Sequence, residues 1–324
     1  MVAASPPLSH LSDGQRAPGL VADRAFRTVA LLAGLSVLII LGLIAFSTTQ
    51  QAWPAFRHQG LSYFTATTWD PANGKFGTLT FLYGTIVASA IALFFAVPVS
   101  IGIALFITEI APRRARRVIV YLIDLLAAVP SVVYGLWGFL VLAPKLTGFY
   151  TNVSHWTKPV PLIGTMFSGR PITGLSFMTA GLVLALMITP IITSITREVF
   201  ATVPVAQKEG AVALGATRWE MIRGAVFPHS RSGIVGGVLI GLGRAMGETI
   251  AVAMVIGSAT SLTGRLFSPG NTMAAGIASQ FGESTGDYRA ALVGLGVVLF
   301  ALTIVIGVIA RGFVARLEAR SAGA

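Results

Sequence analysis

Two charged residues stand inside a long apolar stretch of the chain, and their types and spacing could do chemistry. The run from Gly233 to Gly257 contains Arg244 and Glu248. Because they are four residues apart, a continuous helix would place them on one face. An arginine guanidinium donates two parallel, charge-assisted hydrogen bonds to a tetrahedral oxyanion, and the carboxylate would hold that fork in place. The alternative interpretation is that Glu248 neutralises Arg244 and the pair only fixes helix packing.

The expected depth of Arg244 favours a role in function. It lies about 12 residues, or roughly 18 Å of helix, from residue 232, where the expected span begins, which places it near the middle of a bilayer. A central arginine costs about 2.5–3.5 kcal/mol on insertion scales, so charged residues inside spans are functional candidates by default. We therefore expect Arg244 and Glu248 to line the path of an anionic substrate.

A polar island from Lys208 to Ser230 separates two apolar runs. Pro204 suits the first turn of a helix over 205–214, and Gly215 suits its left-handed end. Thr217 and Glu220 form a capping box that starts a second short helix, which should end before Pro228. Two short helices joined at a glycine would make a compact knob for a groove in a partner. An amphipathic connector lying on the membrane surface would show the same local pattern.

Composition identifies the chain as an integral membrane protein. Of its 324 residues, 54% are hydrophobic and only 11% are charged. The absence of cysteine excludes disulfides and thiol catalysis, and four scattered histidines give little support for a metal site. No GxxxxGK[ST] motif occurs, so we expect no ATP hydrolysis and no enzyme activity by this chain itself.

The apolar runs predict an all-α membrane protein with six transmembrane helices. Lipid cannot satisfy exposed backbone groups, so each span should be helical. Pro98 should kink the second span or extend it beyond the bilayer, and Pro130 should weaken the third. The expected spans cover approximately 28–48, 79–108, 118–142, 174–196, 232–257 and 290–312.

The distribution of basic residues predicts which side of the membrane each connection occupies. The N-terminal tail, the 109–117 and 197–231 connections and the C-terminal tail carry 15 of the 23 Lys and Arg residues. The opposite connections carry 7, and Arg244 is the remaining one. The positive-inside rule then puts both termini and the Lys208–Ser230 island in the cytoplasm. The net charge of +11 is thus a topology signal and requires no nucleic acid.

Four segments in order resemble one family of transport proteins. They are YFTATTWDP (63–71), LLAAVPSVVYGLWG (125–138), EGAVALGATRWE (209–220) and GLGRAMGET (241–249). Together they are similar to the phosphate-specific permeases of ABC importers, of the PstC type, over most of residues 60–312. The resemblance implies a type I ABC importer transmembrane domain, MetI-like, in the last five spans.

The resemblance also implies roles for individual residues. Arg244 and Glu248 match the family's intramembrane charged pair, implicated in phosphate passage. Two positions depart from the general coupling-loop pattern: Gly210 stands where it has alanine, and Ala225 stands where it has a branched apolar residue. The residues that match this "EAA" loop, on which an ATPase docks, are Glu209, Gly210, Ala211, Gly215 and Pro228.

The partners and cofactors follow from the same resemblance. It implies a PstA-like partner permease, a dimer of a PstB-like ATPase and a periplasmic PstS-like phosphate-binding protein. ATP and magnesium would be bound by the ATPase, so no cofactor is expected in this chain. The chain would be a multi-pass protein of the cytoplasmic membrane that carries inorganic phosphate. A permease for sulfate or molybdate is the alternative, and a secondary transporter, which needs no coupling loop, is less favoured.

The domain organisation follows these elements. We expect a disordered cytoplasmic tail over 1–23, rich in Ser, Pro, Gly and Ala, and a first span with its external loop over 24–75. The transporter domain would cover 76–314, with the coupling loop at 203–230, and a second cytoplasmic tail would cover 315–324.

Several features leave alternatives open. Gly237 and Gly241, and likewise Gly243 and Gly247, have the spacing of closely packed membrane helices. Asp124 should cap or pair near the cytoplasmic surface, and the arginines at 113–117 should anchor that side on anionic lipid. Aromatic residues of the external loops 49–77 and 143–173 would form a docking surface or interfacial anchors: Trp53, Tyr63, Trp69, Tyr150 and Trp156.

Overall fold

The computed structural model describes residues 20–161, 163–169 and 173–322. Most of the predicted N-terminal tail, residues 1–19, lies outside the described residues. Helix α1 (Leu20–Gln59) begins inside that predicted tail, so residues 20–23 are helical. The chain divides into two compact units, Met1–Gln50 and Gln51–Ala324. The first unit contributes the long apolar part of α1, whose length and composition suffice to cross a membrane.

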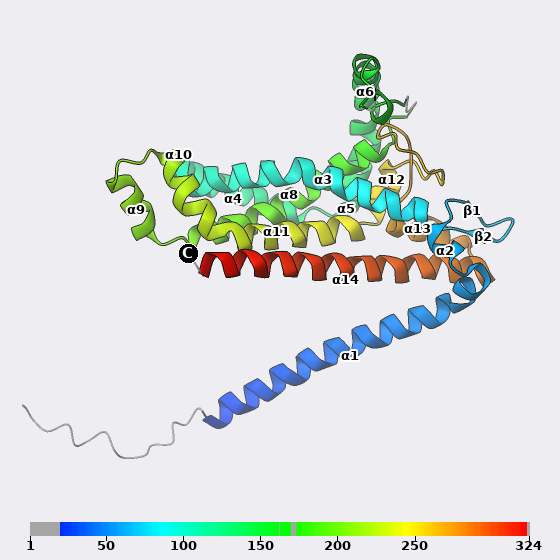
Figure 1. The fold of residues 1–324 in the computed structure, drawn as a ribbon, viewed down its shortest axis with the longest axis horizontal. Coiled ribbons are helices and arrows are strands. Elements are labelled where there is room, and N and C mark those ends of the chain that lie inside the picture. The colour runs from blue at the N-terminus through cyan, green and yellow to red at the C-terminus, as the bar shows by residue number, and fades with distance from the viewer. Residues whose placement is uncertain (1–19, 162, 170–172, 323–324) are drawn as a thin grey trace, which may run out of the picture. The chain divides into compact units, whose positions relative to one another are not determined.

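The second unit holds all the other described elements, and nearly all of them are helical (Figure 1). Its two strands pair antiparallel, with Trp69 opposite Phe76. In chain order the elements are α2 (Ser62–Thr65), β1 (Trp69–Asp70), β2 (Lys75–Phe76), α3 (Leu79–Leu105), η1 (Phe106–Ile110), α4 (Arg113–Ala128), α5 (Ser131–Trp137), η2 (Gly138–Leu142), α6 (Ala143–Thr157), α7 (Ile163–Met166), α8 (Phe177–Ala201), α9 (Val205–Ala213), α10 (Arg218–Met221), η3 (Ile222–Val226), α11 (Phe227–Gly247), α12 (Ile250–Val255), α13 (Met273–Gln280), η4 (Phe281–Glu283) and α14 (Gly286–Ala322).

Helix α8 forms the centre of this unit and packs most extensively against α3 and α11. Small residues allow the close approach: Ala88, Ala92 and Ala96 recur every four residues on α3 and are buried in the core. On α11, a Cβ placed on Gly241 would lie only 2.8 Å from the Ile192 side chain of α8. The predicted close packing of the first glycine pair, Gly237 and Gly241, is therefore confirmed.

Three π-helical segments among the described residues share one local cause. Each ends two residues before a proline: η1 before Pro112, η2 before Pro144 and η3 before Pro228. Proline has no N–H and its ring clashes with the carbonyl four residues back, so the preceding turn widens rather than closing as an α-helix.

The predicted third and fifth spans are wrong in their extent. Val129 and Pro130 are extended, so α4 ends at Ala128 and α5 begins at Ser131, and the apolar stretch long enough to span runs instead from Ser131 to Thr157. The Tyr134 hydroxyl donates to the Leu126 carbonyl across this break, 2.8 Å away. The fifth predicted span is interrupted between α11 and α12, at Glu248 and Thr249.

Among the described residues, five helices are long and apolar enough to cross a membrane, so the expected count of six is not confirmed. They run from Asp23 to Gln59, Leu79 to Ile110, Ser131 to Thr157, Phe177 to Ala201 and Gly286 to Arg316. The last of these belongs to α14, which continues through the predicted tail as far as Ala322.

Different elements lie at the two ends of the second unit (Figure 1). Helices α9 and α10 lie at one end with the C-terminal end of α14, and α2 with the β1–β2 hairpin lies at the other. At the hairpin end, Trp69 and Tyr288 both donate to the Gln280 side-chain oxygen, at 3.0 and 2.8 Å. Trp69 also packs edge-on against Phe76 and Phe81.

Three aromatic residues of the external loops are structural, contrary to both alternatives considered above. Tyr63, Trp69 and Tyr150 are buried. Tyr63 donates to the Ala291 carbonyl at 2.7 Å, and Tyr150 stacks on Phe267 with ring centroids 4.3 Å apart. Aromatic rings at these three positions therefore hold connecting segments against neighbouring elements, whereas Trp53 and Trp156, the other two of the five, are largely exposed.

Candidate functional site

Arg244 lies in the last turn of α11, and its side chain is exposed. The negative end of the helix dipole lies at this turn and favours a cation there by about 0.3–1 kcal/mol. No ion pair of Arg244 occurs within the described part of the chain. Its five N–H donors are thus not engaged in an ion pair with the described residues.

Glu248 does not share a helical face with Arg244, which corrects the sequence-based expectation. Helix α11 ends at Gly247, and Glu248 has an extended backbone with ψ near 128°. Its half-buried carboxylate turns instead toward the start of α12, where Ala251 N lies 3.5 Å from Oε1. The two predicted residues are therefore neighbours at a helix break, and no ion pair joins them.

The second glycine pair is also on the open surface. A Cβ placed on Gly243 or Gly247 would meet no atom within 4 Å, so neither glycine packs against another helix among the described residues. Gly243, Arg244 and Gly247 thus form one exposed arc at the C-terminal end of α11, beyond Gly237 and Gly241, which pack on α8. We call it the Arg244 face. Interrupted helices are tolerated at membrane depth where the backbone is buried in protein or lines a polar cavity.

The Lys208–Ser230 island forms the predicted pair of short helices, α9 and α10. Gly215 has φ +86°, and two backbone bonds close α9 as a Schellman motif: Gly215 N to Val212 O and Ala216 N to Ala211 O. The Thr217–Glu220 capping box is present in both directions, with Thr217 N 2.8 Å from the Glu220 carboxylate. The hydrogen bonds from the Thr217 backbone and hydroxyl hold the pKa of Glu220 below its usual value.

The predicted end of the second short helix is wrong. Helix α10 continues through η3 into α11 without interruption, so Pro228 lies in the first turn of α11. Ala225, one of the two departures from the family pattern, lies within η3 and is half-buried. The widened turn of η3 accommodates the proline while the helical rod continues.

The two faces of this helix pair differ sharply. On the inner face, Met221, Ile222 and Val226 are buried against Phe200, and Ala211 packs on the same cluster. On the outer face, Leu214 is 91% exposed and Trp219 is 61% exposed, with Glu209 and Gly210 also exposed. We call α9, α10 and their joining turn the knob. Sequence reasoning missed Leu214, although an apolar residue in a polar island directly before Gly215 was an available signal.

The family profile of the binding-protein-dependent transport system inner membrane component matches residues 96–322, which include the knob and the Arg244 face. The chain belongs to this family. It is accordingly a permease subunit of an ABC transporter and a multi-pass protein of the cell membrane.

Curated relatives of this inner membrane component extend the match to most of the chain. A protein of Xylella fastidiosa strain 9a5c, named phosphate transport system permease protein PstC, is 48% identical over 298 residues, covering 92% of each chain. A protein of the same name from Mesorhizobium japonicum is 44% identical over 301 residues, again covering 92% of each chain. The similarity anticipated from four motifs is therefore confirmed over nearly the whole sequence.

Solved structures support the fold of this inner membrane component. A bacterial alginate ABC transporter in complex with its alginate-bound periplasmic protein contains a chain with a TM-score of 0.56 and 19% identity, covering 92% of this chain and 98% of that one. The inward-facing MetNI methionine ABC transporter gives 0.53 at 15% identity, covering 77% and 99%. The fold is that of a type I ABC importer transmembrane domain, as expected.

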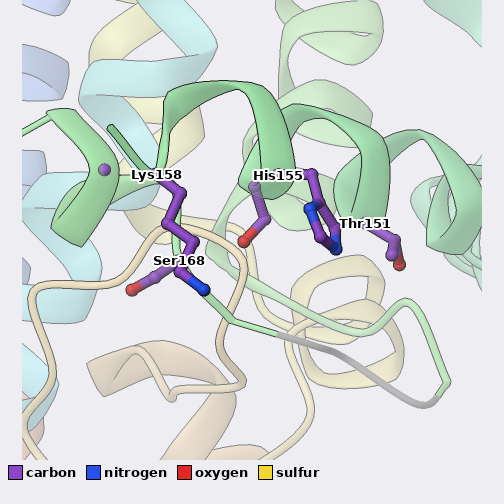
Figure 2. Close-up of a pocket in the computed structure, with 6 residues that line it drawn as sticks. Thr151, His155, Lys158 and Ser168 are labelled. Carbon is purple, nitrogen blue, oxygen red and sulfur yellow. The ribbon is translucent and has the colours of Figure 1, made fainter. Parts of the chain in front are cut away.

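A polar pocket of about 200 Å³ lies beside the end of α6 of this inner membrane component (Figure 2). Lys158 and His155 supply its two basic groups and are both exposed, and no carboxylate lines it. It contains none of the site residues predicted from sequence, so it is separate from the Arg244 face. Its lining residues are Thr151, Ser154, His155, Lys158, Gly164 and Ser168.

Proposed function

We propose that this chain is the permease subunit of an ABC importer that carries inorganic phosphate inward, with ATP hydrolysed by a separate subunit. The observation that carries the proposal is its 44–48% identity, over 92% of both chains, to proteins named as phosphate transport permeases. The knob is consistent with coupling to a separate ATPase, and the Arg244 face is consistent with passage of an anion.

The knob is the surface through which the ATPase moves the permease. Its inner face is fixed by the Met221 and Ile222 cluster, whereas Leu214 and Trp219 project from the outer face. Exposed large apolar groups gathered in a polar segment mark an interaction site. We assign this site to the nucleotide-binding subunit, with Glu209, Gly210, Ala211, Gly215 and Pro228 shaping the contact. ATP and magnesium then belong to the ATPase dimer and no cofactor to this chain.

The Arg244 face is the surface that the anion meets. Phosphate presents several oxygens with the geometry that a guanidinium fork matches. Because no carboxylate of the described residues pairs with Arg244, its charge is available to a substrate that passes. The contact must be brief, since conduction requires binding weak enough to permit release. Glu248 acts beside it by holding the start of α12, and so the helix break, in place.

A second permease subunit completes the pathway. Gly243 and Gly247 leave room for a neighbouring helix or for the anion itself, and nothing in the described residues closes that side. We infer a PstA-like partner across the Arg244 face and a PstS-like binding protein at the hairpin end. Alternation between two states follows when the ATPase dimer closes and moves the knobs of both permeases.

The test is uptake of labelled anions at low external phosphate in cells that lack this chain, with sulfate and molybdate measured in parallel. Selective loss of phosphate uptake, restored when the chain is supplied again, is the expected result. Loss of sulfate or molybdate uptake instead would assign the chain to another oxyanion. Unchanged uptake of phosphate in a strain without a second phosphate system would contradict the proposal.

A further inference from the structure

An ion pair joins the knob to the end of a membrane-spanning helix. Lys208 of α9 donates to Oε1 of Glu109 in η1, with a separation of 2.5 Å. The two side chains are only 21% and 8% exposed. The other ion pair of the described residues, between His58 and Asp287, has both side chains more than half exposed. Of these two ion pairs, Lys208–Glu109 is therefore the one shielded from solvent.

The position of Glu109 follows from the proline that comes after it. Pro112 widens the end of α3 into η1, and Glu109 lies in that widened turn. The neighbouring Ile107 is fully buried, which fixes the turn against the rest of the unit. Glu109 is thus a carboxylate on a firmly held element, close to the end of the span.

The position of Lys208 follows from the geometry of α9. Successive residues of an α-helix point about 100° apart. Lys208 turns inward to Glu109, while Glu209, the next residue, is exposed on the outer face of the knob. Movement imposed on the outer face by a docked partner therefore reaches the inner face through one turn of rigid helix.

The ion pair reaches an element that leads to the Arg244 face. Helix α3 runs continuously into η1 and packs along α8, and it also contacts α11. Helix α11 carries Arg244 in its last turn. Otherwise, α9 packs inward through Ala211 on the Met221 and Ile222 cluster. The ion pair thus links the knob to α3, which contacts α11, the helix that carries Arg244.

We propose that Lys208 and Glu109 are positioning residues that transmit movement of the knob to α3 during transport. The pair contacts neither substrate nor nucleotide, and it sets how tightly ATP hydrolysis is coupled to anion movement. This inference rests on the proposed function for its role in transport. The link itself is a structural property that can be measured separately.

The first experiment measures the link without any substrate. The chain has no native cysteine, so spin labels attach only to cysteines that are introduced. Val212→Cys on α9 and Ile110→Cys in η1 place one label on each element, both at exposed positions. The distance distribution between them should be narrow in the reference chain and broad after Lys208→Met. The reciprocal exchange Lys208→Glu with Glu109→Lys should narrow it again. Equal widths in the reference and Lys208→Met chains would overturn the proposal.

The second experiment measures coupling in proteoliposomes that hold the full complex. The number of phosphate ions moved per ATP hydrolysed should fall on the order of tenfold in Lys208→Met and in Glu109→Gln, and recover in the reciprocal exchange. Lys145→Met removes an exposed lysine of α6 and serves as the matched control with an unchanged ratio. An unchanged ratio in the single variants would refute the coupling role. Failure of the unaltered complex to move phosphate would instead refute the proposed function, and the label distances would still judge the link.

Discussion

Arg244 is the residue on which the proposed anion pathway depends most directly. It is exposed on α11, and no carboxylate of the described residues pairs with it. Hydrogen bonds to a charged group contribute about 1.5–3 kcal/mol, so Arg244→Ala should lower phosphate uptake roughly 10- to 100-fold while the protein stays in the membrane. Arg244→Lys keeps the charge without the fork and should retain part of the activity. Uptake assays measure the loss of transport, and immunoblots of membrane fractions measure how much of each variant remains in the membrane.

Glu248 provides the comparison for that prediction. Its carboxylate faces Ala251 N at the start of α12 and does not pair with Arg244. Glu248→Gln keeps a hydrogen-bond acceptor at this position, so it should reduce uptake much less than Arg244→Ala does. Full uptake by Arg244→Ala, or equal losses in both variants, would contradict the separate roles assigned to the two residues.

Two glycines of the knob allow a matched pair of substitutions. A Cβ on Gly210 would meet nothing within 4 Å, so Gly210→Ala should stabilise α9 by about 0.5–1 kcal/mol. Gly215 has φ +86°, where an L side chain is strained, so Gly215→Ala should cost about 1–2 kcal/mol. Amide hydrogen exchange over residues 205–216 should show slower exchange in the first variant and faster exchange in the second. A change in the same direction in both would show that backbone conformation does not govern the stability of the knob.

Local features of the knob could be predicted from the sequence because their causes lie within a few residues. The capping box needs only Thr217 and Glu220, and the end of α9 needs only Gly215. The contact of Lys208 with Glu109 joins residues 99 positions apart and leaves no local signal. The open surroundings of Gly243 and Gly247 also depend on which helices pack where, so their spacing alone did not show whether a helix of this chain would lie against them.

The third and fifth predicted spans have the wrong extent because a helix ends and another begins inside each apolar run. Hydropathy averages over a window and does not register the extended residues Val129 and Glu248 that end α4 and α11. Pro130 did signal a weak point in the third span, but Glu248 and Thr249 carry no comparable backbone signal. The sequence therefore predicted the helical class and most spans, whereas the two interruptions required the structure.

The knob as an element should bind its partner through its exposed apolar residues. Leu214 is 91% exposed and contributes to no buried cluster, so Leu214→Ser should leave the fold intact and weaken co-purification of the ATPase about tenfold or more. Leu61, which is 84% exposed at the hairpin end, is the matched control, and Leu61→Ser should leave co-purification unchanged. If both variants retain the ATPase equally well, the docking surface lies elsewhere.

Across the whole molecule, basic residues and architecture point to the same orientation. The connections that carry 15 of the 23 Lys and Arg residues include the knob and the start of α4. The knob lies with the C-terminal end of α14, opposite the β1–β2 hairpin (Figure 1). An ATPase that hydrolyses cellular ATP must meet the knob in the cytoplasm. The positive-inside rule and the proposed docking surface therefore require the same side, although they rest on different observations.

This orientation predicts opposite labelling of two exposed alanines. Ala72 lies between β1 and β2, and Ala213 is the last residue of α9. Because the chain lacks cysteine, Ala72→Cys and Ala213→Cys each introduce a single thiol at an exposed position. A membrane-impermeant maleimide should label Ala72→Cys in right-side-out vesicles and Ala213→Cys in inverted vesicles, and bound ATPase should protect only the latter. The reverse pattern would place the knob outside the cell, away from ATP, and would remove the physical basis for coupling through it.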